Sequence, residues 1–272
     1  MFAQAHSRSL SALLSFKTQM PFDRLPVWKE IRALPLEAQK RQLRDPDVRK
    51  RLLENAGARA DHKALGTEAK PPDYDWLFVF DTVFGPHPSV AEVARQRGCH
   101  PAQAMIDLAL ERDLDLFFLQ PVANEDQDHA LEIMRHPRAV VTFSDSGAHV
   151  SQIIDSSLQT HLLSHWVREK QIFTVEQAVR MLTLVPATYW GFADRGLVRE
   201  GFKADLIVFD PDTIAPEMPE VANDLPAGAR RLVQRARGIA ATVVNGEVLL
   251  RNGKHTGALP GQLLRGPAAR RA

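Results

Sequence analysis

The sequence predicts an α/β protein in which an α/β body, residues 1–195, is followed by a small β module, residues 196–257, and a tail, residues 258–272. Apolar strand-like runs alternate with capped helical segments up to about residue 190, a pattern typical of a parallel α/β layer. Beyond Gly196 the strand and turn signals continue without helical periodicity. The 272 residues are 44% hydrophobic and 25% charged, so the chain can bury a core.

The first element is a strand from Phe2 to His6, with no turn or cap before it. Residues 21–75 follow and are rich in proline and charge. A helix is expected there from Pro46 to Asn55, because its apolar residues have helical spacing. We interpret residues 21–75 as a long excursion and not as part of the core.

An alternation of strands and helices begins at residue 76. Two capping boxes mark helix starts, Ser89 with Glu92 and Thr174 with Gln177. Further strands are expected over 76–80, 114–119 and 139–143, and further helices over 101–112, 126–135 and 152–169.

The β module is predicted from an apolar run over 204–209 and a hairpin over 241–250. Asn245-Gly246 lies between two apolar runs, which is the strongest short hairpin signal, and Asn252-Gly253 offers a second turn.

Charge and composition exclude several classes of function. The 34 Lys and Arg residues balance 33 Asp and Glu, and the net charge of +1 gives no electrostatic reason to expect a nucleic-acid or membrane-surface partner. No apolar run approaches the roughly 20 residues of a membrane span, and the first residues lack the order of a signal peptide, so we expect a cytoplasmic protein. Because Cys99 is the only cysteine, any metal would depend on histidine and carboxylate ligands.

The most informative motif is Ser144-Asp145-Ser146-Gly147-Ala148-His149, directly after the predicted strand 139–143. Reactive groups converge at the carboxyl ends of parallel strands, so Asp145 has the position of a metal ligand or a general base. The spacing also allows the simpler interpretation that Asp145 only caps the following turn. Ser146 does not lie in a Gly-x-Ser-x-Gly elbow, which argues against a serine hydrolase. His6 and Arg8 follow the first strand and could face the same site.

His161 and His165 have the spacing that places two imidazoles on one helix face. Leu162 occupies the position that glutamate has in the corresponding zinc motif, and apolar residues share this face. We therefore interpret both histidines as packed or capped side chains and not as metal ligands. The ten histidines contain no His-x-His pair, and the chain has no glycine-rich phosphate loop.

Three segments resemble the N-acyl-D-amino-acid deacylase group, the family 3 branch of the amidohydrolase superfamily. They are 144–149 with Gln159-Thr-His-Leu-Leu, then Arg195 to Asp210, and Val243 to Gly246. The resemblance covers nearly all of the chain and implies the C-terminal part of a (β/α)₈ barrel joined to a β-sandwich. It also implies zinc as the cofactor and hydrolysis of non-peptide C–N bonds, with N-acyl-D-amino acids as the first expected substrates.

The resemblance further implies that Asp145 is the general base for metal-bound water and belongs to the metal site, and that His149 and His6 contribute to substrate binding. The His-x-His pair and the other zinc ligands of the family would precede Met1 and are not in this sequence. The alternative is a non-catalytic fragment, or a partner subunit that supplies Asp145 to a site completed by another chain. Open parallel strands would also favour self-association.

Overall fold

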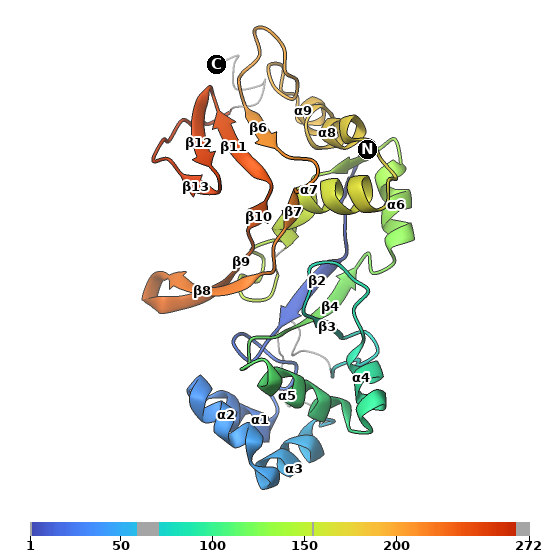
Figure 1. Ribbon diagram of the computed structural model, residues 1–272, viewed down its shortest axis with the longest axis vertical. Helices are drawn as coiled ribbons and strands as arrows, with labels where there is room; N and C mark the ends of the chain where they lie inside the picture. Colours follow the sequence, from blue (N-terminus) through green and yellow to red (C-terminus); the bar gives the residue numbers. More distant parts are fainter. Residues whose placement is uncertain (1, 59–70, 154, 265–272) are drawn as a thin grey trace.

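The computed structural model describes residues 2–58, 71–153 and 155–264. Two bodies lie one above the other along the longest axis (Figure 1). The lower body is formed by residues from 10 to 123, and the upper body contains the first residues of the chain and everything described after residue 126. No helix in the described parts of the chain is long and apolar enough to cross a membrane.

The upper body is built on two parallel strands, β1 (Ala3–Ala5) and β5 (Ala139–Val141). The helix α6 (Gln127–Arg135) precedes β5 and contacts both strands. These three elements make a βαβ unit, as parallel neighbours require a crossover connection. The lower body is inserted in this unit between β1 and α6.

The inserted body contains a three-stranded antiparallel sheet in the order β2-β4-β3. Its strands are β2 (Leu10–Leu14), β3 (Phe78–Phe80) and β4 (Phe117–Ala123). The prediction that the strands expected over 76–80 and 114–119 belong to a parallel layer is therefore wrong.

The connection between β3 and β4 gives the physical reason for the antiparallel pairing. It consists of two helices that pack against each other, α4 (Val90–Arg97) and α5 (Pro101–Glu111). One helix would carry the chain back to the start of β3 and allow a parallel strand. Two helices return it to the end of β3, so that β4 runs in the opposite direction.

The described parts of this segment, residues 21–58 and 71–75, contribute side chains to a hydrophobic core, so their interpretation as an excursion outside the core is wrong as well. The segment contains α1 (Pro26–Arg32), α2 (Leu36–Arg44) and α3 (Pro46–Asn55), the last with the predicted bounds. The fully buried ring of Trp28 stacks on Phe22 with centroids 4.2 Å apart, and its Nε1 donates to the Leu52 carbonyl at 3.0 Å. These contacts give the inserted body a hydrophobic core of its own.

The predicted capping boxes are both confirmed. Ser89 and Glu92 exchange hydrogen bonds at the start of α4, and Thr174 and Gln177 do so at the start of α8 (Val175–Leu182). Gly98 ends α4 in the left-handed conformation at φ 62°.

A helical layer covers β1 and β5. After a 3₁₀ turn (Asp155–Ser157), α7 (Leu158–His161) continues directly into a π-helical segment (Leu162–Glu169). The layer is completed by α8 and by α9 (Leu184–Tyr189). Leu158, Leu162 and Trp166 pack with Ala5 and Val141 in the core of the upper body.

The described residues 206–255 form β-strands with one 3₁₀ turn among them, and the predicted Asn245-Gly246 hairpin is confirmed. A four-stranded sheet has the order β13-β12-β11-β6. Its strands are β6 (Leu206–Phe209), β11 (Ile239–Val244), β12 (Glu247–Arg251) and β13 (Lys254–His255). Asn245 and Gly246 have φ values of 49° and 86°, as a tight hairpin turn requires.

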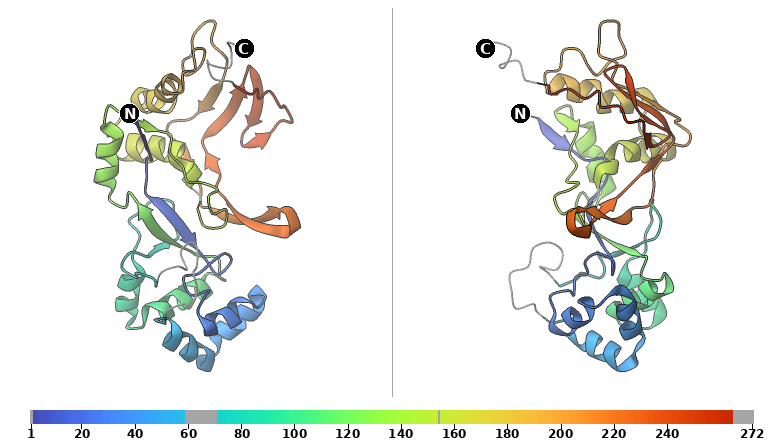
Figure 2. Two further views of the ribbon diagram at one scale, coloured as in Figure 1. Left: turned by 180° about the vertical axis from the view of Figure 1, so that it is seen from behind. Right: turned by 90° about the vertical axis from the view of Figure 1, so that its left-hand side faces the viewer.

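Two further strand pairs join this sheet to the rest of the molecule: β7 (Ala215–Pro216) with β10 (Ala236–Arg237), and β8 (Glu220–Leu225) with β9 (Ala229–Val233). A 3₁₀ turn (Pro226–Gly228) connects β8 to β9, and this hairpin extends away from the upper body (Figure 2).

The described strands form five small sheets and no closed barrel. The assignment of residues 1–195 to the end of a barrel and of residues 196–257 to a β-sandwich therefore stays a prediction.

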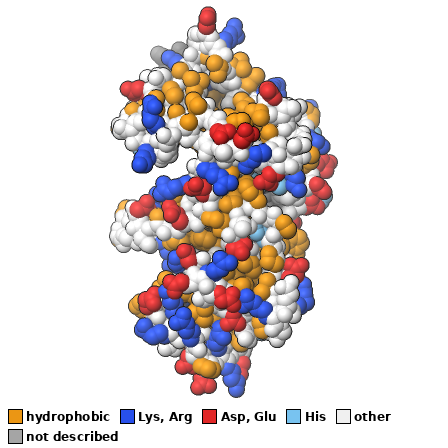
Figure 3. Space-filling view, in the orientation of Figure 1, with side chains coloured by type: hydrophobic (Ala, Val, Ile, Leu, Met, Phe, Trp, Pro, Cys, Tyr) orange, Lys and Arg blue, Asp and Glu red, His pale blue; other side chains and the backbone are white. Residues whose placement is uncertain are grey.

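Hydrophobic side chains gather on the face of the upper body seen in Figure 3. Leu206, Ile207 and Val208 of β6 are 36%, 50% and 54% exposed. The expected self-association also stays a prediction.

Candidate functional site

His6 and Asp145 follow neighbouring parallel strands. His6 comes directly after β1, and Asp145 comes shortly after β5. Beyond the strand ends, the amides of Thr142 and Phe143 both donate to the Ala5 carbonyl, at 3.2 and 3.1 Å. This pairing places the two segments at the same carboxyl edge, where parallel strands present reactive side chains.

Asp145 opens a tight turn without using its carboxylate. Its carbonyl accepts a hydrogen bond from the Ala148 amide at 3.1 Å, and the Ser144 hydroxyl accepts one from the Ser146 amide at 3.2 Å. Gly147 has φ 90°, a conformation that favours glycine. The half-buried Asp145 carboxylate has no hydrogen bond or ion pair with any described residue. The simpler interpretation, that the Asp145 side chain only caps the following turn, is therefore wrong.

The two histidines predicted to bind substrate lie in different environments. His149 is exposed, and its carbonyl ends the same turn by accepting hydrogen bonds from the amides of Gln152 and Ile153, at 2.8 and 2.9 Å. His6 is only 1% exposed, and its Nδ1 accepts a hydrogen bond from the Arg8 amide at 3.1 Å. Their roles in substrate binding stay predictions.

The described residues do not provide a complete metal site. Among the side chains that the structure describes, in ranges 2–58, 71–153 and 156–264, no three or more His, Cys, Asp or Glu are grouped so that they could hold a metal ion. Zinc usually has at least three protein ligands. Asp145 and its described neighbours therefore do not fit this ion by themselves, and the proposed role of Asp145 as a metal ligand stays a prediction.

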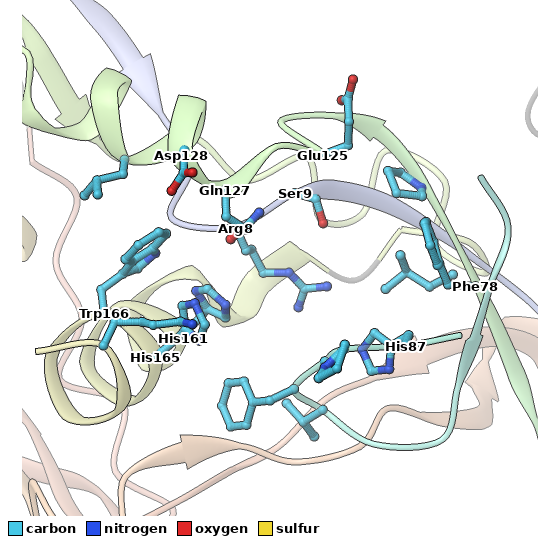
Figure 4. A pocket seen from close by; sticks show the side chains of 18 of the residues that line it. Arg8, Ser9, Phe78, His87, Glu125, Gln127, Asp128, His161, His165 and Trp166 are labelled. Carbon is cyan, nitrogen blue, oxygen red and sulfur yellow. The ribbon is translucent and has the colours of Figure 1, made fainter. Parts of the chain in front are cut away.

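A cavity of about 580 Å³ lies between the inserted body and the helical layer (Figure 4). Arg8 enters it from the end of β1, and His161, His165 and Trp166 come from α7 and the π-helical segment. Aromatic side chains of the inserted body form the opposite wall. Neither Asp145 nor His149 is among its lining residues.

The sequence pointed to this cavity only indirectly, through the spacing of His161 and His165. Their interpretation as packed side chains is confirmed, because the two rings stack with centroids 4.9 Å apart and His161 is only 8% exposed. The π-helical turn that carries His165 is a rare element, frequently found at functional sites. Nothing in the sequence indicated that residues 78–87 of the inserted body would cover these rings.

Burial controls the protonation of the histidines in this cavity. It lowers the pKa of His161 well below the ordinary value, and the charges of Arg8, His165 and His6 lower it further. Burial also lowers the pKa of His165, while the Glu169 carboxylate, 3.2 Å from its Nδ1, opposes this shift. The pKa of His87 is lowered by burial and by Arg8, against the attraction of Asp81.

Comparison with known proteins places the chain in a family. Residues 44–250, more than half of the chain, match the model described as the amidohydrolase family. The chain belongs to the amidohydrolase family. The earlier resemblance is thereby confirmed.

Two curated relatives of the chain come from Alcaligenes xylosoxydans xylosoxydans. N-acyl-D-aspartate deacylase is 30% identical over 166 residues, which cover 60% of this chain and 28% of the relative. N-acyl-D-glutamate deacylase is 32% identical over 136 residues, which cover 47% of this chain and 26% of the relative. The chain thus spans about a quarter of the length of the curated relatives it matches.

A solved structure is also similar to the chain. It is N-acyl-D-glutamate deacylase from Bordetella bronchiseptica in complex with zinc and a phosphonate inhibitor that mimics the tetrahedral intermediate of the reaction. The sequence identity is 28%, the TM-score is 0.45, and the match covers 71% of this chain and 38% of the other.

The chain is expected to lose stability as the pH falls below about 6.5, the ordinary pKa of histidine. His161, His165 and His87 have lowered pKa values when folded, so the unfolded chain binds more protons in this range. Chemical denaturation should show a free energy of unfolding about 1–3 kcal/mol lower at pH 5.5 than at pH 7.5.

Two variants test whether the buried His161 contributes to this pH dependence of stability. His161→Gln should remove about 1 kcal/mol of the difference, whereas substitution of the exposed His136 by glutamine should leave it unchanged. Equal stability of the unsubstituted protein at the two pH values would contradict the assignment.

Proposed function

We propose that the protein takes part in the hydrolysis of the amide bond of N-acyl amino acids, with Asp145 as the general base. The observation that carries the proposal is the position of Asp145. It follows β5 at the carboxyl edge of a parallel strand pair, and its half-buried carboxylate has no partner among the described residues. The deacylase names of the curated relatives support the choice of bond and substrate class.

The proton transfers are those of an ordinary amide hydrolysis. The Asp145 carboxylate accepts a proton from the water that attacks the acyl carbonyl, and a C–O bond forms. Asp145 then gives the proton to the leaving nitrogen as the C–N bond breaks. The products are a carboxylic acid and the free amino acid.

Zinc belongs to this proposal as the cofactor that the family resemblance implies, and it would polarise the carbonyl and activate the water. Since the described residues do not group three ligands, we propose that the remaining ligands come from polypeptide outside these residues. This same observation favours the second candidate function, a subunit that supplies Asp145 to a site completed by another chain.

The proposal is tested by measuring amine release from N-acetyl-D-glutamate and N-acetyl-D-aspartate. The L-enantiomers of both compounds are assayed in parallel. The full chain is assayed with added zinc, alone and after mixing with the polypeptide encoded directly upstream of it. Release by the full chain alone supports a self-sufficient enzyme, and release only from the mixture supports the subunit. No release from any of these substrates in either arm would overturn the proposed function.

A further inference from the structure

A second cavity lies toward the amino ends of the parallel strands, away from the edge that carries Asp145. Its volume is about 790 Å³, and residues of α6, β5, α8 and α9 line it (Figure 1). Phe2, directly before β1, and Ala139, at the start of β5, also belong to its lining. Neither Asp145 nor Arg8 does. The second cavity is therefore separate from the candidate site and from the cavity at Arg8.

The wall of the second cavity is mainly aliphatic, and its deepest part belongs to the upper core. Val140 and Val141 of β5 and Met134 of α6 are buried. Met181 of α8 and Leu184 of α9 continue the apolar wall. Methionine side chains are unbranched and adapt to irregular apolar partners. A cavity of this size with apolar walls is in the range of small-molecule sites.

Two aromatic side chains at this cavity are left largely in water. The rings of Phe2 and Tyr189 meet edge to face, with centroids 5.3 Å apart, and the two residues are 51% and 41% exposed. Both line the cavity. An apolar ligand in the cavity would cover part of this surface, which is unfavourable to expose to water.

Two arginines give the second cavity its charge. Arg135 lies at the end of α6 and Arg180 lies in α8, and both are exposed. Neither guanidinium has a hydrogen bond or an ion pair with a residue that the structure describes. The Cζ of Arg135 lies 5.9 Å from the centroid of the Phe173 ring, which also lines the cavity. No Asp or Glu is among the described lining residues, so the lining does not neutralise the arginines.

We propose that the second cavity binds an aliphatic carboxylate of medium chain length. The alkyl chain lies along the methionine and valine side chains of the wall. The carboxylate lies at the rim that carries Arg135 and Arg180, because planar guanidinium donors match its two oxygens. This inference does not depend on the proposed function, because Asp145 lies near the carboxyl end of β5 and outside this lining.

Calorimetric titration of the full chain with octanoate tests the site, with the neutral octanamide as the matched compound. Octanoate should bind at one site per chain, at least about tenfold more tightly than octanamide, because the amide lacks the charge-assisted hydrogen bonds. Both compounds have the same alkyl chain, so the ratio of their affinities measures the contribution of the arginines.

Substitutions separate the charged and the apolar parts of the site. The double variant Arg135→Gln, Arg180→Gln should abolish the preference for octanoate. Tyr189→Ala should weaken both compounds at least about threefold and keep the preference. Arg138→Gln is the matched control: Arg138 is exposed and close to Arg135 in the sequence, but it does not line the cavity. The control should keep both affinities within about twofold.

Three results would overturn the inference. One is equal affinity for octanoate and octanamide. Another is no binding of octanoate at millimolar concentration, as would follow if a second copy of the chain covered the cavity. The third is a folded double variant, Arg135→Gln with Arg180→Gln, that keeps the preference. If the double variant does not fold, Tyr189→Ala decides, since binding that this substitution leaves unchanged contradicts the site.

Discussion

Replacement of Gly238 by alanine is expected to lower the free energy of unfolding by about 4 kcal/mol. Gly238 connects β10 to β11 with φ 80°, a conformation that alanine adopts at a cost of about 1–2 kcal/mol. A Cβ there would lie 2.5 Å from both the Cα and the backbone nitrogen of Ile214. Ile214 is buried in the upper core, so its backbone cannot move away cheaply.

The matched control for this substitution is Gly201→Ala. Gly201 has nearly the same φ, 81°, but a Cβ there would have nothing within 4 Å. Gly201→Ala should therefore lower the free energy of unfolding only by the conformational cost of about 1–2 kcal/mol. Chemical denaturation of both variants measures the difference. Losses that agree within about 0.5 kcal/mol would show that close packing at Ile214 does not stabilise the β module.

The local elements could be predicted from the sequence because short-range chemistry determines them. The capping boxes at Ser89 and Thr174 and the Asn245-Gly246 turn each involve hydrogen bonds or dihedral angles within a few residues. That His6 and Asp145 lie at the same edge could also be predicted from the sequence, since each comes after a recognisable apolar strand.

The pairing direction and the extent of the core could not be predicted in the same way. Short apolar runs such as 78–80 and 117–119 look alike in parallel and antiparallel sheets, and only the packing of α4 on α5 determines the direction. In the described residues 21–58 the buried side chains, such as Trp28, are separated by prolines and charged residues. Their burial depends on contacts between distant segments, such as that of Trp28 with Leu52.

The candidate site was predicted only in part, because it too depends on contacts between segments that are distant in the sequence. Asp145 comes shortly after β5, so its place near the carboxyl end of this strand could be expected from the sequence, and its role stays a prediction. The cavity at Arg8 joins the end of β1, the inserted body and the π-helical segment, which are far apart in the sequence. The hydrogen bond from Arg8 to the Ser157 hydroxyl joins two distant segments, and no local sequence pattern indicates it.

Asp145→Asn is expected to reduce kcat for amide hydrolysis by about 10³-fold in whichever form of the protein releases amine. The amide side chain of asparagine has nearly the same size but cannot accept the proton from water. Because the Asp145 carboxylate makes no described hydrogen bond or ion pair, the free energy of unfolding should change by less than about 0.5 kcal/mol. Asp212→Asn, in an exposed turn, is the control and should leave kcat unchanged.

The comparison of kcat between the unsubstituted protein and Asp145→Asn tests the central claim most directly. The proposed role predicts a folded variant with a loss of about 10³-fold in kcat beside an active Asp212→Asn control. A folded Asp145→Asn variant whose kcat stays within about tenfold of the unsubstituted protein would contradict Asp145 as the general base.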